Sequence, residues 1–155
     1  MRTYFDHEKL DVYQLELQFI TWATALVVKV NHRPRNARVA EVLDQLDRAS
    51  LSALLNTAEG NGRRQRRTRA KFFDDARGSA GECAACLDAL AAKNVCALEE
   101  IDEGKQLLLR IASMLTKLVE RFDSLSSSSS SSFVREEPEE QHFEEEDDNE
   151  EEGYR

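Results

Sequence analysis

The sequence predicts an all-α protein in which residues 1–125 form an up-down-up-down antiparallel four-helix bundle and residues 126–155 form a disordered acidic tail. Four segments place apolar residues at the three- and four-residue spacing of amphipathic helices. No segment shows the alternation of a strand, and the short connections make consecutive helices antiparallel neighbours. After Leu125 come seven serines and an acidic run, which contain too few apolar residues to offset the entropy of ordering.

The first two helices are expected in the first half of the chain. Apolar residues over about residues 12–30 form a stripe wider than a single seam, and Pro34 ends this segment. The second helix is expected over about residues 38–58. Gly60 and Gly62 follow it, at positions where the C-terminus of a helix favours residues that tolerate a positive φ.

The third and fourth helices follow the same spacing. Thr68 is the expected N-cap of the third helix, which ends near Lys93. Gly78 and Gly81 lie inside it, and each costs about 1 kcal/mol relative to alanine. This cost suggests a close approach of a neighbouring helix, although the glycines can also be simply tolerated. The fourth helix is expected over about residues 97–125.

The formal charge of −9 is unevenly distributed. Residues 126–155 contain ten Glu and two Asp against Arg135 and Arg155, so this segment carries −10. Residues 1–125 contain eighteen acids and nineteen bases, so the body is nearly neutral. Serine runs are typical of flexible linkers. The sequence leaves open whether the acidic tail competes with nucleic acid for a basic surface or only adds solubility.

No segment has the pattern of a secretion signal or a membrane span, so we expect a cytoplasmic protein. An odd number of cysteines argues against a disulfide framework. Cys83 and Cys86 have a CxxC spacing, but a redox motif requires a strand-to-helix context and a zinc site requires two further ligands. Cys96 is the only other thiol. We interpret the cysteines as packing residues of the bundle and expect no metal and no cofactor.

Six basic residues occupy nine positions across the turn between the second and third helices: Arg63, Arg64, Arg66, Arg67, Arg69 and Lys71. Clustered arginine binds phosphate backbones, because the guanidinium group offers two parallel donors. The alternative is a solvated turn that adds solubility, and the density of the cluster favours nucleic acid. Arg33, Arg35 and Arg38 form a smaller cluster in the first connection, which an up-down bundle places at the opposite end.

A polar motif precedes the basic run. Asn56 and Glu59 are spaced to share one helix face, and Glu82 on the third helix can lie close to that face in an antiparallel pair. One interpretation is a polar site at the end of the bundle. A structural network is favoured, because buried polar groups must be paired. The sequence contains no recognisable catalytic constellation, and we expect no catalytic residues and no enzyme.

Several motifs together resemble one known family. They are Phe5 with Leu10–Gln14, Gln45–Ser50, Asn56–Gly60, Phe72–Phe73 and Ala76–Glu82. Together they resemble the four-helix bundle family named for proteins encoded in intervening sequences of bacterial large-subunit (23S) ribosomal RNA genes. The accessory variability determinant of diversity-generating retroelements is similar and belongs to the same family. Thr57 departs from the aliphatic residue usual in the family, and the acidic tail has no counterpart in the motif.

The resemblance implies a homopentamer without known catalytic activity and with a nucleic-acid-binding role, in which RNA is favoured over DNA. For the retroelement branch it implies a reverse transcriptase as partner. An apolar surplus on the first helix, with Phe19 and Trp22 on different faces, also predicts an oligomer. The leading hypothesis is a non-enzymatic oligomeric nucleic-acid-binding adaptor. The alternative is a protein-interaction scaffold, such as a reverse-transcriptase accessory subunit.

Overall fold

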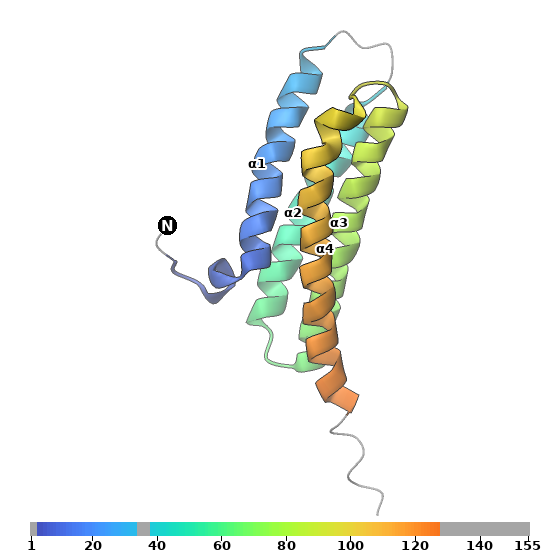
Figure 1. The fold of residues 1–155 in the computed structure, drawn as a ribbon. Coiled ribbons are helices and arrows are strands. Elements are labelled where there is room, and N and C mark those ends of the chain that lie inside the picture. Colours follow the sequence, from blue (N-terminus) through green and yellow to red (C-terminus); the bar gives the residue numbers. More distant parts are fainter. Residues whose placement is uncertain (1–2, 34–37, 128–155) are drawn as a thin grey trace, which may run out of the picture.

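The computed structural model describes residues 3–33 and 38–127, and the side chains up to residue 124. The described part contains a short 3-10 helix and four α-helices, and no strand. The elements are η1 (Asp6–Lys9), α1 (Asp11–Asn31), α2 (Ala40–Gly62), α3 (Arg66–Ala92) and α4 (Leu98–Ser127). Consecutive helices run antiparallel, which confirms the predicted four-helix bundle (Figure 1). α4 includes the first two serines of the tail, and residues 128–155, for which disorder is expected, lie outside the described residues.

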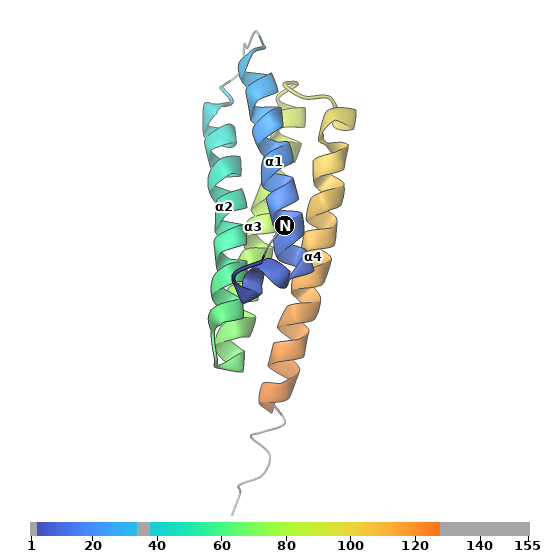
Figure 2. The ribbon, with the colours of Figure 1, turned by 90° about the vertical axis from the view of Figure 1, so that its left-hand side faces the viewer.

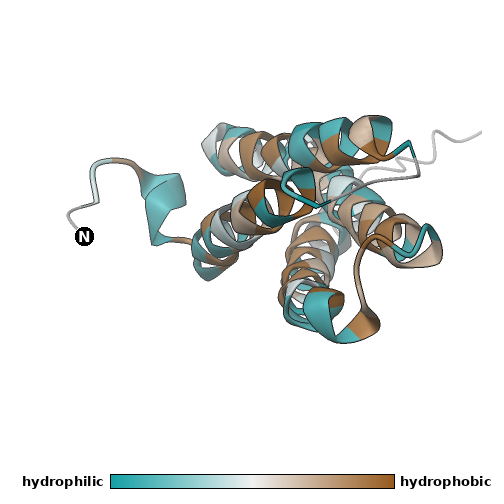
Figure 3. Cartoon of the chain, turned by 90° about the horizontal axis from the view of Figure 1, so that it is seen from above, coloured by the Kyte–Doolittle hydropathy of each residue, from teal (hydrophilic) through white to brown (hydrophobic). Residues whose placement is uncertain are grey.

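The helices are arranged so that α3 packs along both α2 and α4, and α1 lies against α2 and α4. α1 therefore sits diagonally across from α3 and covers the face between the other two helices (Figure 2). The α1–α2 and α3–α4 connections lie at one end of the bundle (Figure 1). The α2–α3 turn and the C-terminal end of α4 lie at the other end. Seen from above, η1 lies outside the four helices (Figure 3).

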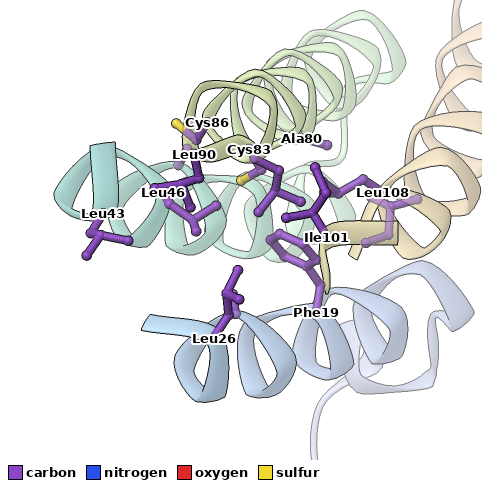
Figure 4. Close-up of a cluster of buried hydrophobic side chains, with 14 of the residues drawn as sticks. Phe19, Leu26, Leu43, Leu46, Ala80, Cys83, Cys86, Leu90, Ile101 and Leu108 are labelled. Atoms are coloured by element: carbon purple, nitrogen blue, oxygen red, sulfur yellow. The ribbon is translucent and has the colours of Figure 1, made fainter. Parts of the chain in front are cut away.

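All four helices contribute to one hydrophobic core. Phe19 of α1, Leu46 of α2, Cys83 of α3 and Ile101 of α4 are buried together in it (Figure 4). Such a core stabilises the bundle in proportion to the apolar area removed from water, at about 25 cal/mol per Å². Among the described residues, no helix combines the length and the apolar character that crossing a membrane requires.

The C-terminus of α2 differs from the prediction. The helix continues through Gly60 and ends at Gly62, and neither glycine has a positive φ. Gly60 instead serves a close approach of helices, because a Cβ there would lie 3.0 Å from the Cβ of Phe72 and 3.2 Å from a ring carbon of Phe73. Among the residues that the structure describes, the positive φ belongs to Asn94, at 54°, shortly after the end of α3.

The close approach expected at Gly78 and Gly81 is also absent. A Cβ at either position would have no atom within 4 Å, so these glycines are tolerated on an open surface. Gly104 of α4 is the position that requires a glycine, because a Cβ there would overlap the six-membered ring of Trp22. The Trp22 ring also packs 5.7 Å from that of Phe19. The two aromatic residues therefore meet at the α1–α4 contact, and the expectation that they occupy different faces is wrong.

The start of α3 lies earlier than predicted. α3 begins at Arg66 after Gln65, whose backbone is extended, so Thr68 is not the N-cap. The Thr68 hydroxyl instead donates to the side-chain oxygen of Gln65 at 3.2 Å. Arg69 donates from Nη2 to the backbone and side-chain oxygens of Asn61, both at 3.1 Å. The bonds from Arg69 join the first turn of α3 to the last turn of α2.

Candidate nucleic-acid interface

The predicted basic residues lie at one end of the bundle, together with the last turns of α4. We call this surface the basic end and define it as residues 63–71 with Arg121 and Phe122. Four of its predicted cations, Arg63, Arg66, Arg69 and Lys71, contact other parts of the chain. The remaining two are exposed, so the six residues do not form one uniform set.

Phe122 of α4 is a platform for two arginines of α3. The guanidinium carbons of Arg66 and Arg69 lie 5.0 and 4.5 Å from the centroid of its ring. Arg66 also donates from Nη2 to the carbonyl oxygen of Arg121 at 2.9 Å. On the inner side, the Phe122 ring lies 5.8 Å from that of buried Phe73. Phe122 thus packs against the core through Phe73, and its ring supports the guanidinium groups of Arg66 and Arg69.

Phe72 provides a second, smaller platform. The guanidinium carbon of Arg63 lies 5.0 Å from its ring centroid, and the Lys71 ammonium lies 6.0 Å away. Both cations also pair with acids four residues away, Arg63 with Glu59 in the last turn of α2 and Lys71 with Asp75 of α3 at 2.8 Å. Such exposed pairs contribute little to stability, and they reduce the free charge of these two residues.

Arg64 and Arg67 are different. Their side chains are exposed and make no hydrogen bond, ion pair or ring contact with any other residue that the structure describes. Arg67 borders a shallow hollow between α3 and α4, which is also lined by Lys71 and by Asp74 and Asp123. A guanidinium group without a partner can form two parallel hydrogen bonds to a phosphate. Within the basic end, these two arginines are therefore the groups most available to an anionic ligand.

The opposite end of the bundle contains a different arrangement, which we call the Glu100 end. The Glu100 carboxylate accepts hydrogen bonds from Arg33, Lys29 and the backbone N–H of Ala97. These hydrogen bonds, the one from Arg33 most strongly, hold the pKa of Glu100 well below its ordinary range. Arg33 also donates to the carbonyl oxygen of Val95 at 2.7 Å.

Arg33 thus belongs to the end opposite the basic end, as predicted for the smaller basic cluster. Arg35 lies outside the described residues. Arg38 and Lys93 lie near the same end, and their exposed side chains have no partner among the residues that the structure describes. They provide a comparison for the free arginines of the basic end, because they are cations of similar exposure at the far end of the molecule.

The polar motif is not gathered into one network. Asn56 donates to the Ser52 hydroxyl at 3.3 Å, and Glu59 pairs with Arg63. Glu82 accepts a hydrogen bond from Gln45 at 3.2 Å. Gln45 lies about three turns before Asn56 on α2, so the structure separates Glu82 from the other two residues. Each of the three residues makes its own local contact between or along helices.

A buried acid lies inside the bundle on the side of the basic end. Glu16 of α1 is only 2% exposed, and its Oε1 accepts a hydrogen bond from the Thr57 hydroxyl at 2.7 Å. Its Oε2 is buried without a hydrogen-bond partner among the described residues. Burial raises the pKa of Glu16 to about 8, against the opposing effect of the hydrogen bond from Thr57. The carboxyl group is therefore protonated in the folded protein at neutral pH.

The cysteines are packing residues, as predicted. Cys83, Cys86 and Cys96 are free and buried. Burial raises the pKa of the Cys83 thiol to about 12, which keeps it protonated and unreactive at neutral pH. No group of three or more His, Cys, Asp and Glu residues within the described part is arranged to hold a metal ion.

Sequence reasoning misses the packing roles of three residues in the bundle. Apolar spacing places Phe122 in the core and gives no sign that its ring supports Arg66 and Arg69. Glu16 falls between Val12 and Phe19 in the apolar stripe of α1, and an acid at such a position signals a buried carboxyl group. Gly104 interrupts an otherwise strongly amphipathic helix, but nothing in the sequence identifies Trp22 as its neighbour.

Comparison with known proteins identifies the family. The family model described as 23S rRNA-intervening sequence protein matches residues 8–117, which include the polar motif and all six predicted basic residues. No curated protein matches the chain significantly. The matched family is not a known family of enzymes. Because the match covers well over half of the sequence, the chain belongs to the 23S rRNA-intervening sequence protein family.

Proposed function

We propose that this protein is a non-enzymatic nucleic-acid-binding adaptor that contacts the phosphate backbone through its basic end. The observation that carries the proposal is the pair of exposed arginines, Arg64 and Arg67, which have no partner in the described part of the chain. Around them, Arg66 and Arg69 are held over the Phe122 ring, which leaves their charge uncancelled. RNA is the favoured ligand, because the family is named for proteins encoded within ribosomal RNA sequences.

Assembly into an oligomer remains part of the proposal. Its support is the exposure of large apolar side chains on the outer helix faces, such as Leu51 and Leu55 of α2, which lie one turn apart. Trp22 does not support it, because this ring is partly buried and packs against Gly104 and Phe19 of its own chain. Repetition of the basic end in an oligomer would increase affinity for a long polyanion through multivalency.

A matched pair of double variants tests the phosphate contact. Arg64→Ala/Arg67→Ala removes the two free cations of the basic end, and Arg38→Ala/Lys93→Ala removes two cations of similar exposure at the Glu100 end. Both are compared with the wild type in titrations of a fluorescently labelled single-stranded RNA of mixed sequence over a series of salt concentrations. Duplex DNA of the same length is titrated in parallel.

We expect the basic-end variant to bind RNA more weakly and with a shallower salt dependence. For each phosphate that the variant no longer neutralises, the slope of log K against log salt should fall by about 0.7 with a single strand and by about 0.9 with a duplex. The Glu100-end variant should retain the wild-type affinity and slope. Equal affinities for all three proteins, or no binding by any of them, would favour the scaffold hypothesis, in which the arginines contact an acidic protein.

A further inference from the structure

The chain leaves the bundle at the basic end. α4 ends at Ser127, and Arg121 and Phe122 in its last turns contact Arg66 at the start of α3. α4 has 30 residues, so it spans about 45 Å at 1.5 Å per residue. The Glu100 end is therefore about one helix length away from the point where the remaining residues begin. The point at which the chain leaves α4 is therefore beside the basic end.

We propose that residues 136–152, which we call the acidic segment, dock on the basic end of their own chain and cover Arg64 and Arg67 when no nucleic acid is bound. The acidic segment contains twelve acids and no lysine or arginine. The two arginines have no partner in the described part of the chain. A carboxylate accepts the same two parallel guanidinium hydrogen bonds as a phosphate, so the segment offers the chemistry that these arginines bind.

The length of the connection fits this contact. Residues 128–135 join α4 to the acidic segment, and these eight residues reach at most about 29 Å when fully extended. The first acids of the segment therefore reach the basic end but not the Glu100 end. Tethering through a short connection gives an effective concentration in the millimolar range. The basic end is also the cationic surface beside which α4 ends.

The docking concerns the site of the proposed function, and its regulatory consequence rests on that function. The acidic segment would compete with phosphates for the same two arginines and raise the concentration of nucleic acid that binding requires. The competition should weaken with salt, because the Debye length falls from about 10 Å at 0.1 M to about 3 Å at 1 M. The docking itself can be measured without any nucleic acid.

Arginine modification tests the docking directly. The full-length protein is compared with a full-length variant in which the ten tail glutamates are replaced by glutamine, and phenylglyoxal reactivity is read by peptide mass mapping. At low salt we expect Arg64 and Arg67 to react several-fold faster in the variant, and at high salt to react equally in both proteins. Arg38, at the Glu100 end, should react equally throughout. Equal rates for Arg64 and Arg67 at low salt would overturn the docking.

Titration of the same two proteins with labelled single-stranded RNA separates the docking from the proposed function. If both are correct, the variant binds RNA more tightly at low salt, and the gain shrinks as salt increases. Protection of Arg64 and Arg67 without RNA binding by either protein would support the docking and contradict the proposed function. RNA binding with equal affinity and equal arginine reactivity would contradict the docking alone.

Discussion

The two ends of this bundle both contain arginine, but they use it in opposite ways. At the Glu100 end, Arg33 and Lys29 share one carboxylate, which offsets one of their two charges and caps the start of α4. At the basic end, Arg66 and Arg69 lie over the ring of Phe122, whose face attracts a cation without neutralising it.

The number of arginines in a connection therefore does not measure the positive potential that the connection presents. The first connection and the α2–α3 turn are both basic in the sequence. Only the structure shows that Glu100 occupies Arg33, whereas Arg64 and Arg67 have no partner in the described part of the chain. The neighbours of the buttressed arginines also differ, because Arg66 and Arg69 lie over an aromatic ring and Arg33 pairs with a carboxylate.

The two ends also differ in the pKa of a glutamate, and this difference predicts the largest effect on stability. Glu16 is buried on the side of the basic end with a pKa raised to about 8, whereas the ion pairs at the other end lower the pKa of Glu100. For Glu16, the unfolded chain releases its proton near pH 4.3. The free energy of unfolding should therefore decrease as pH rises from about 4.3 to about 8, by up to roughly 1.4 kcal/mol per pH unit.

Glu16→Gln should remove this decrease in the free energy of unfolding. The variant should therefore become more stable than the wild type as pH rises from 5 to 8, with a difference on the order of several kcal/mol. Glu100→Gln is the control of opposite sign. The stabilisation from Glu100 is present above pH 4.3 and is lost at lower pH, so this variant should lose stability at neutral pH and match the wild type in acid. Urea unfolding at several pH values measures both, and parallel pH profiles for wild type and Glu16→Gln would show that Glu16 does not carry a raised pKa in the folded protein.

Phe122→Ala should disrupt the packing of the basic end and lower the free energy of unfolding by less than the glutamate effect. The change removes the ring contact with Phe73 and the platform under Arg66 and Arg69. Full burial of a phenylalanine is worth about 3–5 kcal/mol against alanine, and Phe122 is half-buried, so we expect a loss of about 2 kcal/mol in the free energy of unfolding.

Leu109→Ala on the same helix is the matched control, because Leu109 is 69% exposed. Its effect should stay within about 0.5 kcal/mol. Chemical denaturation followed by circular dichroism gives both values. A Phe122→Ala variant as stable as Leu109→Ala would show that the ring does not hold the basic end together.

The sequence predicts the helical parts of this molecule well, because apolar spacing is a property of each segment by itself. The bundle, the burial of the cysteines and the placement of Arg33 at the opposite end all follow from that spacing and from short connections. The helix boundaries near Gly60 and Thr68 do not follow, because tertiary contacts of Gly60 and the extended backbone of Gln65 decide them.

The candidate site is predicted only in outline. The density of arginine identifies the basic end, but which arginines are free depends on residues far away in the sequence. Phe122 lies more than fifty positions after Arg66, and the pairing of Gln45 with Glu82 depends on the register of α2 against α3. Residue spacing within one helix carries no information on contacts between helices. The sequence therefore identifies the basic residues, and only the folded structure shows which of them lack a partner.

We propose that nucleic acid contacts the basic end and not the Glu100 end. Photo-crosslinking of a single-stranded RNA that contains 4-thiouridine, followed by mass spectrometry of the crosslinked peptides, locates the contact. We predict crosslinks in the peptide that spans Asn61–Arg77, which contains Phe72 and Lys71, and at the end of α4 near Phe122. Crosslinks concentrated around Lys93 and Cys96, or spread evenly over both ends, would contradict it.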